Sequence, residues 1–219
     1  MEGEGGAKDP HAAANAGKPG QMCRQAGLGM GPVLSWCKYA HFIILLVEGE
    51  DDAMIDLHLH LDGSLPPALV RELALEQGYP VPAALEGALR APEDCASLNE
   101  YLKCFDLPLA LLQNGEALER AAYAVCMGLQ RQGLLYAEIR FAPQLHTRQG
   151  LAQRQAVEAA ARGVARSGFP AQLILCCMRG GGDSANRETL AVAAQALGSG
   201  VCACDLAGAE ALYPTPATI

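Results

Sequence analysis

The pattern of hydrophobic and polar positions after residue 54 switches between two periods. Short apolar runs typical of buried strands alternate with longer stretches whose apolar residues are spaced by three and four, as in amphipathic helices. We expect strands at 55–60, 134–141, 172–178 and 201–206. We expect helices at about 66–78, 97–109, 116–132, 151–167 and 188–197, with Ser64 and Ser97 near the N-caps of the first two.

Strands that alternate with helices in this order predict an α/β fold with a parallel sheet and right-handed crossovers. A doubly wound open sheet and part of a (β/α)₈ barrel both fit the order. The Gly-x-Gly-x-x-Gly fingerprint of dinucleotide-binding folds is absent after the first strand. The glycine triplet 180–182 follows the third strand, but without a Walker lysine it is a weak phosphate signal.

Residues 1–53 differ from the rest of the chain. The first 32 residues are rich in Gly, Ala and polar side chains and show neither period, which indicates disorder. Met54 stands directly before the first strand. We therefore expect a disordered or non-native leader at 1–53, an extension upstream of the natural start, and a domain at 54–219. A genuine tail is the alternative.

Composition narrows the class of protein. The chain is 51% hydrophobic and 18% charged with a net charge of -8, which indicates a globular protein and argues against nucleic-acid binding through phosphates. Nine cysteines without a Cys-x-x-Cys pair indicate buried thiols in a reducing, cytoplasmic protein. The apolar segment 33–47 is too short, and too interrupted by charge, to span a membrane.

Two histidines on the first strand are the main candidates for chemistry. Alternate strand residues share a face, so His58 and His60 can reach one metal ion at the strand end, where barrel enzymes place their sites. Leu57, Leu59 and Leu61 are then expected to face the helix layer. A histidine pair packed in a polar core is the alternative. A catalytic zinc site needs a third protein ligand and an open position.

Four segments resemble the adenosine deaminases of the metal-dependent hydrolase superfamily. His-Leu-His-Leu-Asp-Gly-Ser at 58–64 is similar to their first-strand motif. Glu-Ile-Arg-Phe-Ala-Pro at 138–143, Ile-Leu-Cys-Cys-Met-Arg at 174–179 and Asp-Leu-Ala-Gly-Ala-Glu at 205–210 are similar to the next three, in the same order. The match covers residues 54 to about 212. The four motifs together favour the adenosine branch over dihydroorotase-like relatives.

The resemblance implies a (β/α)₈ TIM barrel with one Zn²⁺ ion, here truncated after about four strands. It implies His58 and His60 as zinc ligands, with His60 and Asp62 also binding the nucleoside, Asp62 at its ribose hydroxyl end. It implies a backbone contact from Gly208 to the purine, with a plain turn glycine as the alternative. Ala209 stands where the family usually has Asp.

A helical segment carrying Tyr101, Leu102 and Phe105 resembles the family's apolar gate over the purine, although its spacing alone would make it ordinary core. Other polar residues are expected to be structural. We place His146 in a solvated loop, and Arg140 and Glu138 in salt bridges or the barrel layer. Asp205 is not expected to bind metal.

The implied reaction is zinc-dependent hydrolytic deamination of adenosine or deoxyadenosine to inosine or deoxyinosine, in purine salvage. The family's third zinc histidine and its general acid/base glutamate lie on the fifth strand, whereas no His follows His146 and no Asp follows Asp205 here. We therefore expect the catalytic residues beyond Ile219 and no turnover from this chain.

Two other functions stay open. One is a non-catalytic module that binds nucleosides or pairs with a separately encoded half, and the other is another zinc amidohydrolase. Four strands cannot close a barrel, so we expect association or aggregation through the open edges. The expected ligand in each case is a small molecule, a purine nucleoside in the first, rather than a nucleic acid or a membrane.

Overall fold

The computed structural model describes residues 44–46, 54–91, 95, 97–210 and 212–214, with the side chains of 44–46, 98 and 99 left aside. All of these belong to one compact unit, Ser35–Ile219. The expected leader at 1–53 lies outside the described residues apart from a short strand at 44–46, so its disorder stays a prediction.

The described strands form a single sheet in the order in which they occur along the chain. They are β1 (Ile44–Leu46), β2 (Met54–His60), β3 (Leu134–Phe141), β4 (Ala171–Met178) and β5 (Val201–Ala207). β1 pairs antiparallel with β2, and the four predicted strands β2 to β5 pair in parallel. A doubly wound sheet reverses its strand order at a switch point. The parallel strands here follow one another without reversal, as strands do in a barrel wall.

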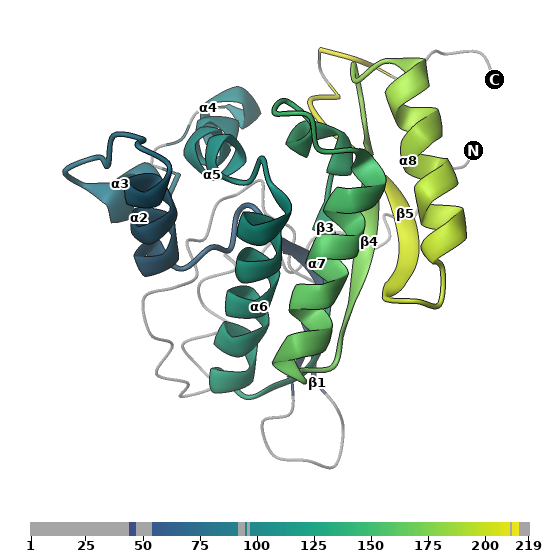
Figure 1. The fold of residues 1–219 in the computed structure, drawn as a ribbon, viewed down its shortest axis with the longest axis horizontal. Helices are drawn as coiled ribbons and strands as arrows, with labels where there is room; N and C mark the ends of the chain where they lie inside the picture. Colours follow the sequence, from purple (N-terminus) through teal and green to yellow (C-terminus); the bar gives the residue numbers. More distant parts are fainter. Residues whose placement is uncertain (1–43, 47–53, 92–94, 96, 211, 215–219) are drawn as a thin grey trace, which may run out of the picture. The chain divides into compact units, whose positions relative to one another are not determined.

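Helices connect the parallel strands and pack against them. They are α2 (Pro67–Glu76), α3 (Leu85–Ala88), α4 (Leu98–Leu102), α5 (Asp106–Leu111), α6 (Gly115–Arg131), α7 (Gln153–Ser167) and α8 (Asp183–Ala196), with 3₁₀ turns η1 (Lys103–Phe105) and η2 (Pro143–His146). Figure 1 shows α6 and α7 side by side in front of β3 and β4, with α8 next to β5. None of the described helices is long and apolar enough to cross a membrane.

Three helices differ in detail from the expected ones. The helix expected at 97–109 is capped by Ser97 as predicted, but it breaks into α4, η1 and α5. Pro108 has no backbone N–H and is tolerated only in the first turn of a helix, so a new helix starts at Asp106. α2 follows Pro66 without a side-chain cap from Ser64. α8 starts at Asp183 instead of 188, directly after a left-handed glycine.

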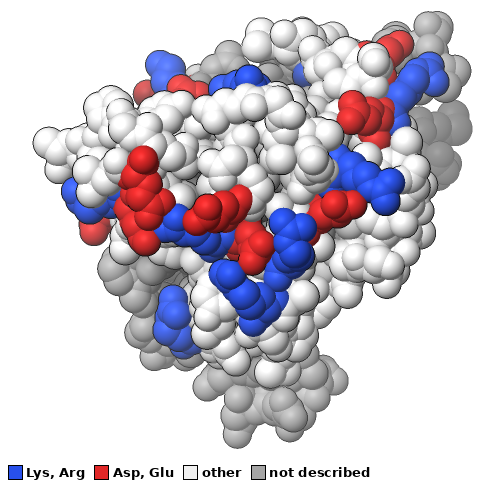
Figure 2. Space-filling model, in the orientation of Figure 1, with Lys and Arg blue, Asp and Glu red and all other residues white. Residues whose placement is uncertain are grey.

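α6 and α7 approach each other closely because their contact faces carry small residues. Gly163 of α7 lies against α6, where a Cβ atom would come within 2.9 Å of the Ala122 Cβ and would meet the carbonyl oxygen of Glu119. Ion pairs extend over the exposed side of the same helices. Glu119 accepts hydrogen bonds from Arg162 at 3.1 Å and Arg166 at 2.9 Å, and Figure 2 shows positive and negative side chains interspersed across this face.

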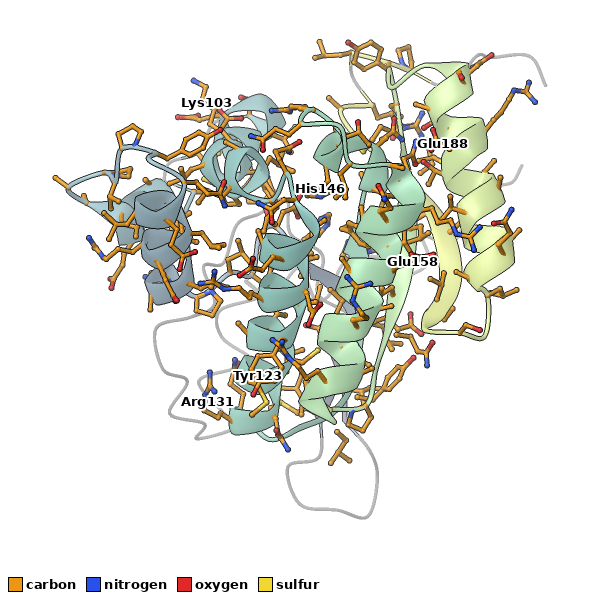
Figure 3. The ribbon with its side chains drawn as sticks, viewed as in Figure 1. Lys103, Tyr123, Arg131, His146, Glu158 and Glu188 are labelled. Carbon is orange, nitrogen blue, oxygen red and sulfur yellow. The ribbon has the colours of Figure 1, made fainter. Side chains whose placement is uncertain are left out.

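His146 is buried, so the expectation of a solvated loop is wrong. Its side chain is fully inaccessible, and its Nδ1 lies 2.7 Å from the carbonyl oxygen of Leu112 (Figure 3). Gln113 holds the same loop by accepting from the N–H of Arg148 at 3.0 Å and donating to the carbonyl of Leu145 at 3.0 Å. These bonds tie η2 and the residues just after it to Leu112 and Gln113, so the segment turns inward. Burial lowers the pKa of His146 to about 4.

The close approach of α6 and α7 predicts that Gly163→Ala destabilises the protein. The added methyl group has no space without separating the helices, so the free energy of unfolding should fall by about 1–3 kcal/mol in urea denaturation. Gly128→Ala in α6 is the matched control, since its Cβ would have only the Arg131 guanidinium nearby, at 4.0 Å. That substitution should raise stability by about 0.5–1 kcal/mol. Equal stability of the two variants would contradict the packing.

The buried imidazole of His146 predicts a pH-dependent stability. Its folded pKa of about 4 lies below the ordinary value of 6.5, so only the unfolded chain takes up a proton between these two values. This contribution is fully present above pH 6.5 and is lost as the pH falls toward 4. Between pH 7 and 5 the wild type should lose about 2 kcal/mol more stability than His146→Gln, measured by urea denaturation at both pH values. Parallel pH profiles for the two proteins would refute it.

Candidate metal and nucleoside site

The carboxyl ends of β2 to β5 lie at one edge of the sheet because these strands are parallel. This edge is where barrel enzymes collect catalytic side chains from several strands. β2 ends at His60 and continues into the buried residues Leu61 and Asp62, and β5 ends one residue before Gly208. The residues singled out from the sequence therefore lie at the ends of two strands, β2 and β5.

The rings of His58 and His60 lie next to each other, with centroids 5.6 Å apart and planes tilted by 45°. Leu59 and Leu61 enter the hydrophobic core, as expected. Leu57 does not, because the register between β2 and β3 shifts at Ile55 and shifts back after Asp56: Asp56 is opposite Ala137, and Leu59 is opposite Ile139. Three steps along β2 thus match two along β3, which is the geometry of a β-bulge.

His60 is neutral at pH 7. Burial lowers the pKa of His60 to about 4, assisted by the charges of His58 and Arg140, while Asp205 opposes the shift. A neutral imidazole has a lone pair on one ring nitrogen, which is the form that binds transition metals. Among the described residues no group of three or more His, Cys, Asp or Glu could hold a metal ion. The histidine pair is therefore a partial ligand set, and its ligand role stays a prediction.

Asp62 is a buried carboxyl group with an unused acceptor. Its side chain is 7% exposed, and its Oδ1 has no hydrogen-bond partner among the described residues. Burial raises the pKa of Asp62 to about 6, against the lowering effect of the backbone N–H groups of residues 62 and 63. A buried acceptor without a partner is costly unless a ligand supplies one, so this oxygen is suited to a ligand hydroxyl.

Phe105 closes over the turn that follows β2. Its ring lies edge-on to His60 with centroids 6.0 Å apart, and Tyr101 lies edge-on to Phe105 at 5.4 Å. A Cβ atom at Gly63 would come within 2.9 Å of the Phe105 ring, so glycine permits this contact. The segment that resembles the apolar gate therefore packs on His60 through Phe105, and its gate role stays a prediction.

An ion pair between Arg140 and Asp205 crosses the sheet beside the histidines. Arg140 of β3 lies opposite His60, and its guanidinium donates to the carboxylate of Asp205 on β5, reaching across β4. This confirms the structural role expected for Arg140. Glu138, by contrast, is 3.4 Å from the hydroxyl of Tyr136, which donates to it.

Gly208 lies on the far side of the parallel sheet from β2. Its φ of +115° is a conformation that favours glycine, and a Cβ atom there would come within 3.3 Å of the backbone nitrogen and Cβ of Arg179. The N–H of Arg179 donates to Ala207 at 2.8 Å, which joins the ends of β4 and β5. The close approach of two backbones explains the glycine. A purine contact stays a prediction.

Sequence reasoning missed Asp56. This carboxylate is 4% exposed, and its Oδ1 accepts a hydrogen bond from the backbone N–H of His58 at 2.9 Å. An Asp side chain that binds the backbone two residues further on forms an Asx turn. The signal available was an aspartate in an apolar strand, two residues before a histidine.

The Arg140–Asp205 pair predicts a large stability loss for Asp205→Asn. The substitution leaves the guanidinium of Arg140, whose side chain is only 12% exposed, without its counter-charge. The free energy of unfolding should fall by about 2 kcal/mol, less than for a fully buried pair because Asp205 is partly exposed. Glu158→Gln breaks the exposed Arg154–Glu158 pair and should cost less than about 0.5 kcal/mol. Equal losses in denaturant would show that the inner pair is solvated.

Comparisons with known proteins identify the family. Residues 54–218 match the family model described as adenosine deaminase. An adenosine deaminase from Haemophilus ducreyi is 53% identical over 175 residues, covering 74% of this chain and 51% of its own length. The structure of an N6-methyl-AMP deaminase from Arabidopsis thaliana superposes with a TM-score of 0.62 at 26% identity, covering 75% of this chain and 51% of the other.

An amidohydrolase from Burkholderia ambifaria with bound Zn superposes with a TM-score of 0.59 at 21% identity, a likeness that shows the fold alone; it covers 73% of this chain and 45% of the other. The chain spans about half the length of the curated relatives it matches. With the sequential parallel sheet, these matches confirm the predicted α/β fold of the barrel type. The chain belongs to the adenosine deaminase family.

Proposed function

We propose that residues 54–214 supply the N-terminal half of the active site of a zinc-dependent deaminase of adenosine or deoxyadenosine. The observation that carries the proposal is the adjacency of His58 and His60 at the carboxyl end of β2, beside the buried carboxyl group of Asp62. A metal-binding pair and a polar nucleoside contact on one strand end are what this chemistry needs from one half of a site.

The donor set fits zinc. Imidazole nitrogen is a usual zinc ligand, and the low pKa of His60 means that no proton has to leave before the ion binds. When bound, zinc supplies an activated water as the nucleophile for deamination. In this proposal His58 and His60 hold the ion. Family resemblance suggests the site, and the Burkholderia amidohydrolase of the same fold has Zn bound.

The remaining residues bind and shield the nucleoside. The unused oxygen of Asp62 accepts a ribose hydroxyl in this proposal, which would satisfy the only buried acceptor at the end of β2 that lacks a partner among the described residues. Phe105 and Tyr101 form an apolar roof next to His60, suited to the face of a purine and to the exclusion of water. Gly208 offers backbone polar groups at the end of β5.

We infer that this half-site does not deaminate on its own. The described residues contain no complete metal ligand set, and no histidine follows His146 in the 219 residues. The resemblance places the family's general acid/base glutamate and third zinc histidine on a fifth barrel strand, which is not among the four parallel strands described. The described cysteines, Cys95, Cys104, Cys126, Cys176, Cys177, Cys202 and Cys204, are all free, which supports a reducing compartment such as the cytoplasm.

A second candidate function, a module that pairs with another polypeptide, rests on the outer strand β5. Apart from Asp205 its sequence is apolar, as in the interior of a parallel sheet, yet Cys204 and Leu206 are exposed, Leu206 by 51%. Such an edge can add another parallel strand. The pairing candidate and the half-site proposal predict the same completed barrel, and they differ in whether one polypeptide or two supplies it.

The proposal predicts that adding the second half of a relative restores deamination. Residues 54–214 would be fused to the C-terminal half of the Haemophilus ducreyi adenosine deaminase, and inosine formation from adenosine would be measured. The unfused chain should show no turnover. The fusion should be active, and His58→Ala or His60→Ala should lower its rate by at least about 100-fold.

Asp62→Ala should raise the KM of the fusion about tenfold, because it removes one charge-assisted hydrogen bond to the nucleoside. Glu158→Gln on the exposed side of α7 is the matched control and should leave the rate unchanged. Inosine formation by the mass-verified unfused chain would contradict the half-site. An active fusion that tolerates both histidine substitutions would contradict the ligand assignment.

A further inference from the structure

The bulge in β2 restores the register that places the two histidines on the face opposite the helices. An earlier shift between Met54 and Ile55 displaces the pairing by one residue, and the bulge between Asp56 and Leu59 displaces it back. After the bulge, Leu59 pairs with the buried Ile139, and His60 pairs with Arg140. Laterally paired residues in a parallel sheet share a face, so the leucines enter the helix-side core while His60 joins Arg140 on the opposite face. Before the bulge, Asp56 pairs with Ala137, which is also fully buried.

If the shift between Met54 and Ile55 stayed and the extra residue in β2 were absent, the pairing from Asp56 onward would remain displaced by one residue. His58 would then lie opposite Ile139 and His60 opposite Phe141, both of which belong to the hydrophobic core. Leu59 would move to the face of Arg140. A one-residue slip exchanges the two faces of a strand. Both histidines would then leave the face of Arg140 and point into the helix layer.

Asp56 supplies a bond that favours the bulged form. Its Oδ1 accepts from the N–H of His58 at 2.9 Å, within the three-residue step where β2 gains its extra residue. A local Asx bond of this kind competes with the regular ladder for a backbone donor and tightens the chain over two residues. The pairing of β1 with β2 ends at the same residue, Asp56, so the bulge begins where that ladder stops.

We propose that Asp56 is a positioning residue for the metal-binding pair. It stabilises the β2 bulge, and the bulge keeps His58 and His60 on the face of the sheet that carries Arg140, opposite the helices. The inference rests on the zinc site of the proposed function. Asp56 does not touch the metal or substrate in this role. It acts through the backbone of His58, and a neutral acceptor of the same shape should serve as well as the carboxylate.

The first experiment is metal-free and uses Asp56→Asn, which keeps an acceptor at the same position, and Asp56→Leu, which removes it at similar size. Thr189→Val is the matched control, because Thr189 is a fully buried polar residue on α8, which packs on β4 and β5. Amide hydrogen exchange by NMR should show the His58 N–H losing at least tenfold protection in Asp56→Leu only. Unchanged protection in a folded Asp56→Leu would overturn the proposal.

The second experiment titrates Zn²⁺ into the same full-length chains and follows the ring nitrogens of each histidine by long-range ¹H–¹⁵N correlation. In the wild type, Asp56→Asn and Thr189→Val, zinc should shift both His58 and His60 with affinities within about threefold. In Asp56→Leu the His58 shift should be lost and the affinity should fall about 10- to 100-fold, as for other residues that orient ligands. Equal loss in Asp56→Asn and Asp56→Leu would overturn the role of the acceptor.

The two experiments separate this inference from the proposed function. If zinc shifts neither ring in the wild type, the zinc site fails, while the exchange data still decide whether Asp56 holds the bulge. If Asp56→Leu does not fold, Asp56→Gln replaces it, since its amide lies one methylene too far for the two-residue turn. Retained His58 protection in Asp56→Gln would overturn the proposal, and its selective loss would support it.

Discussion

The pairing register between β2 and β3 is the constraint on which the rest of the site depends. β2 must present leucines to the helices and histidines to the opposite face, and β3 must do the same with Ile139 and Arg140. Because side chains alternate on each side of the bulge, a slip of one residue would exchange the leucines and the histidines between the two faces. The core and the site are therefore not independent: the burial of Leu59 and Leu61 is what fixes the direction in which His60 points.

Packing against the helices stabilises this register of β2 and β3. α2, α6 and α7 contribute most of the buried residues that surround the helix-side faces of β2 and β3, and many of them are alanines that let helices approach closely. A slip in β2 would put imidazoles into that layer without hydrogen-bond partners, at a cost of a few kcal/mol for each buried polar group. The exposed ion pairs over the same helices add little by comparison, because water screens them (Figure 2).

The sequence predicted those elements whose formation depends mainly on the spacing of apolar residues. All four parallel strands and the helices α6 and α7 follow from apolar spacing alone, and the adjacency of His58 and His60 follows from their separation by two. The bulge did not, because one extra residue leaves the apolar pattern of a seven-residue strand nearly unchanged. The burial of His146 was missed for a related reason: it results from hydrogen bonds to Leu112 and from the clamp by Gln113, both more than thirty residues away.

The parts of the site differ in how much of the chain is needed to fix their geometry. The histidine pair is set within β2 and its ladder with β3, by contacts that are all present among the described residues. The distance from Asp62 to Gly208, in contrast, depends on the curvature of the sheet over β2, β3, β4 and β5, which barrel closure adjusts through strand tilt and stagger. The orientation of the histidine pair should therefore depend less on the second half of the fold than purine recognition does. The Arg140–Asp205 ion pair connects these two parts of the site. It lies beside His60 at one end and reaches β5, the strand that precedes Gly208, at the other.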